Sequence, residues 1–133
     1  MSEYLIHLQA FLQWLGLSLL LAGAFIALYV WITPPHELKL IRGGNVSAAV
    51  MVGGTVLGYV LPLASALVHG ANLIDFLIWG VIAMLVQLAL YLVMRLAYPK
   101  LTQDIVEDRV SVAILAAALA LATGILNAAS MVG

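Results

Sequence analysis

The chain has 133 residues, of which 65% are hydrophobic and 8% charged, and its formal net charge is −1. A soluble domain of this length cannot bury so much apolar surface, so the composition predicts an all-α integral membrane protein with one domain over 1–133 and excludes a separate soluble catalytic domain. The chain has no cysteine, which excludes disulfides and thiolate metal sites, and we expect no cofactor, no bound metal and no nucleic-acid partner.

Four apolar stretches near 8–32, 46–69, 73–97 and 110–131 predict four transmembrane helices. Each stretch has the roughly 20 residues needed to cross about 30 Å of hydrocarbon. The first differs from a secretory signal because Glu3 is the only charged residue before it and its apolar run exceeds the usual length of about 7–15 residues. We therefore expect it to be retained as a membrane anchor.

Two longer polar segments separate these stretches, at 34–42 and 99–108. The first begins with Pro34-Pro35 and ends before Gly43-Gly44, which predicts a short helix lying on the membrane surface. Both segments are either solvated connectors or a docking surface for a cytoplasmic partner. In the second case the contact residues are expected to be Glu37, Lys39, Arg42, Asp104 and Glu107.

The basic residues predict the orientation of the chain. All five flank the two longer segments, namely Lys39, Arg42, Arg95, Lys100 and Arg109. The link at 70–72 and both termini have no Lys or Arg. The positive-inside rule therefore places the longer segments in the cytoplasm and both termini on the periplasmic side.

An offset of 65 residues aligns the sequence with itself. Phe11-Leu12-x-Trp14 then coincides with Phe76-Leu77-x-Trp79, and Pro34 coincides with Pro99. These matches predict two parallel helical-hairpin repeats, about 1–67 and about 68–133. Such repeats are related by an axis along the membrane normal, with any site between them.

Small residues are concentrated in the stretches 46–69 and 110–131, which are therefore expected to be the central helices. The contact positions are expected to be Gly54, Gly58, Ala116, Ala120, Gly124 and Ala128. These positions could pack within one chain or between chains. We expect a homo-oligomer, because four short helices rich in small residues leave surface to bury.

Pro62 interrupts the second stretch and frees the carbonyl of Gly58. None of the candidate polar residues inside the membrane is a carboxylate or a Lys. One interpretation is a polar or ion site that uses the freed carbonyl. The other is a proline kink with polar side chains bonding between helices. The candidate residues are Gly58, Tyr59, Pro62, Ser65, Thr123, Asn127 and Ser130.

The sequence resembles the YjfL family of small bacterial inner-membrane proteins over nearly its whole length. The resemblance lies in Ile32-Thr33-Pro34-Pro35-His36-Glu37, Gly54-Thr55-x-Leu57-Gly58-Tyr59-Val60, Pro62-Leu63-x-Ser65-Ala66 and Gly124-Ile125-x-Asn127-Ala128-Ala129. It implies an inner-membrane location and tandem two-helix repeats. The family is known chiefly as a domain of unknown function, with genes often reported near those for phage-shock-type membrane-stress proteins. It supplies no catalytic or binding residue.

Three classes of function follow. The favoured one is a non-enzymatic, oligomeric module linked to envelope or membrane stress. The alternative is a small passive channel or carrier for an ion or small polar solute. An enzyme needs a nucleophile or an acid–base pair within reach of each other, and the chain offers only scattered Ser and no His clustered with a carboxylate, so we expect no enzyme.

Overall fold

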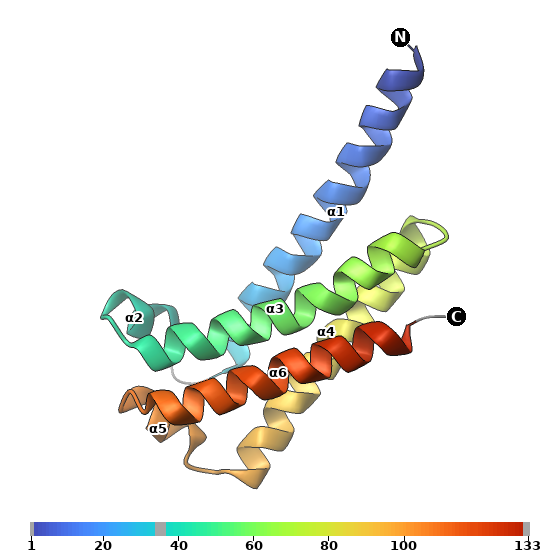
Figure 1. The fold of residues 1–133 in the computed structure, drawn as a ribbon. Helices are drawn as coiled ribbons and strands as arrows, with labels where there is room; N and C mark the ends of the chain where they lie inside the picture. The colour runs from blue at the N-terminus through green and yellow to red at the C-terminus, as the bar shows by residue number, and fades with distance from the viewer. Residues whose placement is uncertain (1, 34–36, 132–133) are drawn as a thin grey trace.

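The computed structural model describes residues 2–33 and 37–131, and the predicted helix start at 34–36 lies outside them. Within these ranges the chain is all-α, as predicted, with no strand. The helices are α1 (Ser2–Ile32), α2 (Glu37–Arg42), α3 (Val46–His69), α4 (Leu73–Ala97), α5 (Leu101–Val106) and α6 (Val110–Ser130) (Figure 1). Four of them, α1, α3, α4 and α6, are long and apolar enough to cross a membrane.

The predicted spans agree with these helices except at two ends. The helix expected at 8–32 begins at Ser2, and the one expected to end at 131 ends at Ser130. Asn45 and Asn72 determine two of the starts, because their side chains accept hydrogen bonds of 2.8 Å from the amides of Ala48 and Asp75. Such N-caps satisfy amides that have no partner within the first turn of a helix.

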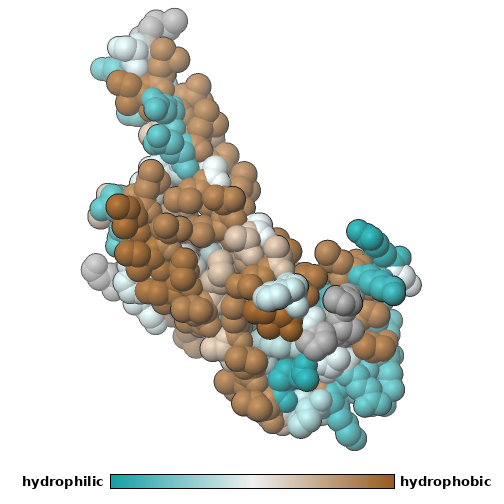
Figure 2. Space-filling view, turned by 180° about the vertical axis from the view of Figure 1, so that it is seen from behind, coloured by the Kyte–Doolittle hydropathy of each residue, from teal (hydrophilic) through white to brown (hydrophobic). Residues whose placement is uncertain are grey.

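Figure 2 shows hydrophobic side chains over most of one face of the molecule, with hydrophilic ones at the end that carries α2 and α5 and along the projecting start of α1. We call this the α2–α5 end. The opposite end holds the turn between α3 and α4 and is called the turn end. The two ends differ in composition because the short helices and their flanks hold all the basic residues.

The closest backbone approach is between α3 and α6, which lie side by side (Figure 1). A Cβ atom added to Gly58 would lie 2.7 Å from Gln87 Nε2 and 2.8 Å from the carbonyl carbon of Ala120. A Cβ on Gly124 would lie 2.7 Å from Gly58 Cα and would also meet the Gly58 carbonyl oxygen. Gly54 approaches Ala117 in the same way. The small-residue positions therefore pack within one chain.

Of the two helices expected to be central, only α3 is. Half of its most apolar stretch is buried, whereas α6 buries the same smaller share as α4. The physical reason is that α6 uses one face, with Ala116, Ala120 and Gly124, against α3 and leaves the opposite face uncovered.

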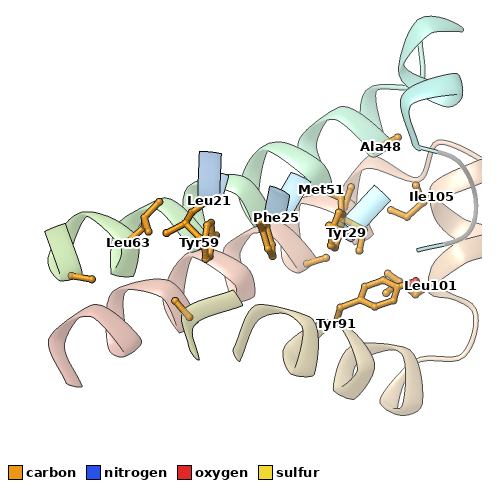
Figure 3. Packing of buried hydrophobic residues seen from close by; sticks show 14 of the residues in the cluster. Leu21, Phe25, Tyr29, Ala48, Met51, Tyr59, Leu63, Tyr91, Leu101 and Ile105 are labelled. Carbon is orange, nitrogen blue, oxygen red and sulfur yellow. The ribbon is translucent and has the colours of Figure 1, made fainter. Parts of the chain in front are cut away.

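Aromatic side chains attach α1 to this core (Figure 3). Phe25 stacks on Tyr59 with ring centroids 4.4 Å apart, and Tyr29 meets Tyr91 edge-on at 5.8 Å. Pairs of this kind contribute about 0.5–1.5 kcal/mol beyond their burial. The buried residues of α1, which also include Leu21, all lie in its second half. Trp14 also contacts Phe76 of α4, with ring centroids 5.6 Å apart, and only the first turns of α1 extend away from the other helices (Figure 1).

The contact between α3 and α6 predicts that the effect of an added methyl group on stability depends strongly on its position. Gly124→Ala should destabilise the protein by about 1–3 kcal/mol, since its new Cβ meets backbone that cannot yield easily. Gly53→Ala is the matched control, because a Cβ at Gly53 meets nothing within 4 Å. Thermal unfolding in detergent should show a lower midpoint for Gly124→Ala only. Equal midpoints would mean that the two helices do not approach this closely.

Candidate functional site

The seven residues predicted to form a polar site do not come together in one cavity. Gly58 and Pro62 are buried in the contact between helices. The Gly58 carbonyl, which Pro62 leaves without its helical donor, lies against Gly124 of α6. Tyr59 is also in the core, where its hydroxyl donates to the Gly80 carbonyl oxygen at 3.0 Å. The break in α3 is therefore filled by another helix.

Two of the seven line a pocket of about 390 Å³ at the turn end. Ser65 Oγ donates to the Ala128 carbonyl oxygen at 3.2 Å, and Ser130 Oγ donates to the Leu126 carbonyl oxygen at 2.7 Å. The pocket residues are Ser65, Ala66, His69, Gly70, Ala71, Asp75, Trp79, Ser130 and Met131. With a carboxylate, an imidazole, an indole and two hydroxyls, this pocket offers groups that bind a small polar molecule.

The remaining two residues, Thr123 and Asn127, lie on α6 outside the pocket lining. Asn127 Nδ2 is buried and has no hydrogen-bond partner among the described residues. A buried amide of this kind normally finds a partner, because leaving it without one costs about 1–3 kcal/mol.

The residues expected to form a contact surface divide into two groups. Lys39, Arg42 and Glu107 are exposed, as a docking surface requires. Glu37 and Asp104 are only 2% and 3% exposed, so their assignment to that surface is corrected. Both carboxyls turn inward because their short helices pack on the ends of the spanning helices.

Asp104 is fully paired in its buried position. Tyr98 Oη donates to Asp104 Oδ2, and Arg109 Nε lies 3.5 Å from Asp104 Oδ1. The hydrogen bond to Asp104 is the main reason that the pKa of Tyr98 is raised. Asp104 thus has a structural role, since its charge is neutralised by Arg109.

The sequence analysis did not predict that Glu37 is buried. It lies beside Thr33 and Tyr29 of the first span, and burial raises its pKa to about 8 although those hydroxyl groups act in the opposite direction. The sequence carries no local signal for this burial, because α1 ends at Ile32 and Glu37 begins a separate helix. Within the described residues, no three His, Asp or Glu side chains are grouped as metal ligands.

The hydrogen bonds at the α2–α5 end connect the two halves of the chain. Asn45 Nδ2 donates to the Ile105 carbonyl oxygen at 2.8 Å, and the Ser47 amide donates to Asp108 Oδ1 at 2.8 Å. This amide bond is the main reason that the pKa of Asp108 is lowered. The start of α3 is therefore fixed to the loop that follows α5.

A family model described as a domain of unknown function, DUF350, matches residues 3–131. The chain belongs to the DUF350 family. Two curated members, both named UPF0719 inner membrane protein YjfL, come from Escherichia coli strains K12 and O157:H7. Each is 36% identical over 124 residues, which cover 93% of this chain and 94% of the relative. No solved structure matches significantly. The resemblance to the YjfL family is thus confirmed.

Membership of the DUF350 family and four apolar helices make this chain a multi-pass inner-membrane protein. The printed names of the family and of its members assign no activity. The pocket at the turn end and the residues around Glu37 lie within the matched range of residues 3–131.

The unpartnered amide of Asn127 leads to a prediction that separates packing from binding. Asn127→Leu should leave the protein as stable as the parent or stabilise it, because the change removes a buried donor that lacks an acceptor. Ser65→Ala is the control and should destabilise it slightly, by about 0.6 kcal/mol, through loss of the bond to Ala128. Thermal unfolding in detergent measures both. A clear loss of stability in Asn127→Leu would show that the amide has a partner in the membrane.

Proposed function

We propose that the protein is a non-enzymatic, oligomeric module of the bacterial inner membrane that supports the envelope under membrane stress, with its α2–α5 end in the cytoplasm. The observation that carries this proposal is the joining of the two loops into one platform by Asn45 and Asp108. Because α3 is bonded to the loop after α5, the two short helices present a single surface. Such a surface suits contact with a partner or with lipid head groups.

The charge of this platform supports a cytoplasmic location. Its exposed residues include Lys39, Arg42, Lys100 and Arg109, and the turn end has no Lys or Arg. Basic residues beside a transmembrane helix favour the cytoplasmic side and attract anionic lipids, by about 1 kcal/mol for each residue near the surface. The platform is therefore suited to a partner or membrane surface that carries negative charge.

The packing of the spans supports a module rather than a pore within one chain. The contact of Gly58 with Gly124 closes the middle of the bundle between α3 and α6. The first half of α1 has no buried residue, and both Gln9 and Gln13 are exposed on it. Amide side chains exposed near lipid gain from interhelical hydrogen bonds, which supports association with a second copy.

Charge reversal tests the platform. Lys39→Glu combined with Arg42→Glu should abolish the ability of the protein to preserve membrane potential in stressed cells that lack the native gene. The reason is that the exposed positive charge of α2 is lost while its buried side is unchanged. A potential-sensitive dye reports the result, and native mass spectrometry checks that the oligomer persists. Full protection by the doubly substituted protein would contradict the proposal.

Glu3→Gln serves as the matched control for this experiment. It changes one exposed charge at the start of α1, far along the chain from α2, and should protect as well as the parent. Loss of protection by this control as well would mean that the assay responds to any charge change, and the platform would then have no special role.

The second candidate is a passive channel or carrier for an ion or small polar solute. The pocket of about 390 Å³ at the turn end favours it, because Ser65, Asp75 and Ser130 bring polar groups to the ends of three helices. If this candidate is right, purified protein in liposomes should conduct K⁺, Na⁺ or H⁺, and Asp75→Asn and Asn127→Leu should reduce the flux. Flux no greater than that of empty liposomes, from folded protein, would leave only the module.

A further inference from the structure

Glu37 differs from the other buried carboxyl in having no basic partner among the described residues. Asp104 is neutralised by Arg109, and both ion pairs of the described residues involve that arginine. Glu37 is 2% exposed, and its Oε2 atom has no hydrogen-bond partner in the described chain. Burying an ionised carboxylate without a partner costs several kcal/mol, so such a group takes up a cation or becomes neutral.

The surroundings of Glu37 suit a neutral carboxylic acid. The Thr33 hydroxyl donates to the Tyr29 carbonyl oxygen at 2.7 Å, so its hydrogen is not directed at the carboxyl group. The Tyr29 hydroxyl is buried and, like Glu37 Oε2, is without a partner among the described residues. A carboxylate only accepts hydrogen bonds, whereas a carboxylic acid also donates one. A proton on Oε2 would therefore supply the donor that this cluster lacks.

No charged group on the neighbouring helices replaces that proton. On α1 the titratable neighbour is Tyr29, and α3 contributes the hydroxyl of Thr55 near that ring. On α4, Tyr91 meets Tyr29 edge-on, and its hydroxyl accepts a hydrogen bond of 3.1 Å from Arg95. Arg95 is thus directed at Tyr91. On α2 itself the basic groups are Lys39 and Arg42, and both are exposed.

We propose that Glu37 is a proton-binding site, in which a proton on Oε2 faces the Tyr29 hydroxyl while α2 is docked, and that release of this proton to water draws the carboxylate out and frees α2 from the bundle. Glu37 is the only fully buried residue of this six-residue helix. The docking of α2 therefore depends on the protonation of one side chain. The proton site does not involve the partner of the platform. Its test can therefore succeed or fail independently of the function proposed above.

The direction of the pH dependence follows from the raised pKa. The pKa of Glu37 is about 8 when α2 is docked and near the ordinary value of 4.5 when the side chain is in water. Between these two values the released form loses its proton while the docked form keeps it. Docking is therefore strongest below the ordinary value, weakens about tenfold per pH unit up to about pH 8, and is constant above that.

Infrared difference spectroscopy of the purified, detergent-solubilised protein tests for the proton directly. At neutral pH the spectrum should contain the carbonyl band of a protonated carboxylic acid, and this band should disappear on titration well above the ordinary range. Glu37→Gln should lack it. Absence of the band from the parent at neutral pH would overturn the proposal.

Selective labelling keeps this test valid if Glu37→Gln fails to fold. The other two glutamates, Glu3 and Glu107, are exposed to solvent, whereas Glu37 is buried. Incorporation of ¹³C-carboxyl glutamate into the unsubstituted protein should shift the band if it belongs to Glu37. A band that does not shift would belong to an aspartate, and the proposal would be wrong.

The release of α2 can be followed by thiol labelling, because the chain has no cysteine. Leu40→Cys places a thiol on the half-buried side of α2, and Lys39→Cys is the matched exposed control that corrects for thiolate chemistry. The labelling rate of Leu40→Cys relative to Lys39→Cys should rise more than tenfold from about pH 6 to about pH 8 and then level off. In a Glu37→Gln background the ratio should stay low at every pH.

Two results of the labelling experiment would overturn the proposal. The first is a ratio that does not change with pH in the parent. The second is a ratio that changes when choline in the buffer is replaced by Na⁺ at constant pH. A metal cation rather than a proton would then neutralise Glu37.

Discussion

At Gly58 and Gly124 the backbones of α3 and α6 approach so closely that neither residue has room for a Cβ atom. Lipid tails are as apolar as the helices, so contact of this kind, rather than hydrophobic burial, holds spanning helices together. Gln87 of α4 donates to the Ala120 carbonyl oxygen beside it at 3.0 Å. Tyr59, one residue from Gly58, positions α4 through Gly80 and α1 through Phe25. The placement of every span thus depends on this one contact.

The sequence predicted the features that depend on local chemistry. Hydropathy gave the four spans, and the small residues identified Gly58 and Gly124 as contact positions. The polar site at Pro62 was not predicted correctly as one cavity, because the freed carbonyl is covered by α6, a tertiary contact without a local signal. The burial of Glu37 was missed for the same reason. The two repeats, the oligomer and the orientation stay predictions.

The two short helices occupy similar positions in the two halves of the chain, but their buried carboxyl groups have different partners. Each half of the chain has a long helix, a six-residue helix and a second long helix, in that order. In the second half the buried carboxyl, Asp104, is held by Tyr98 and Arg109. In the first half the described groups beside the buried carboxyl, Glu37, are the hydroxyls of Thr33 and Tyr29. One end of the platform is therefore fixed by charge, and the other is held by neutral contacts that ionisation can break.

The length of α1 has a mechanical consequence. Its 31 residues extend about 46 Å, which exceeds the hydrocarbon thickness of about 30 Å, so a membrane can hold it only at a steep tilt or with one end projecting. Trp14, Phe25 and Tyr29 attach it to α3 and α4, so only the turns before Trp14 lack an aromatic contact with the other helices. When the bilayer becomes thinner or thicker, the cost of mismatch falls on the turns before Trp14, which the other helices do not hold in place. The start of α1 is therefore the part of the molecule that is most exposed to a change in the thickness of the surrounding lipid.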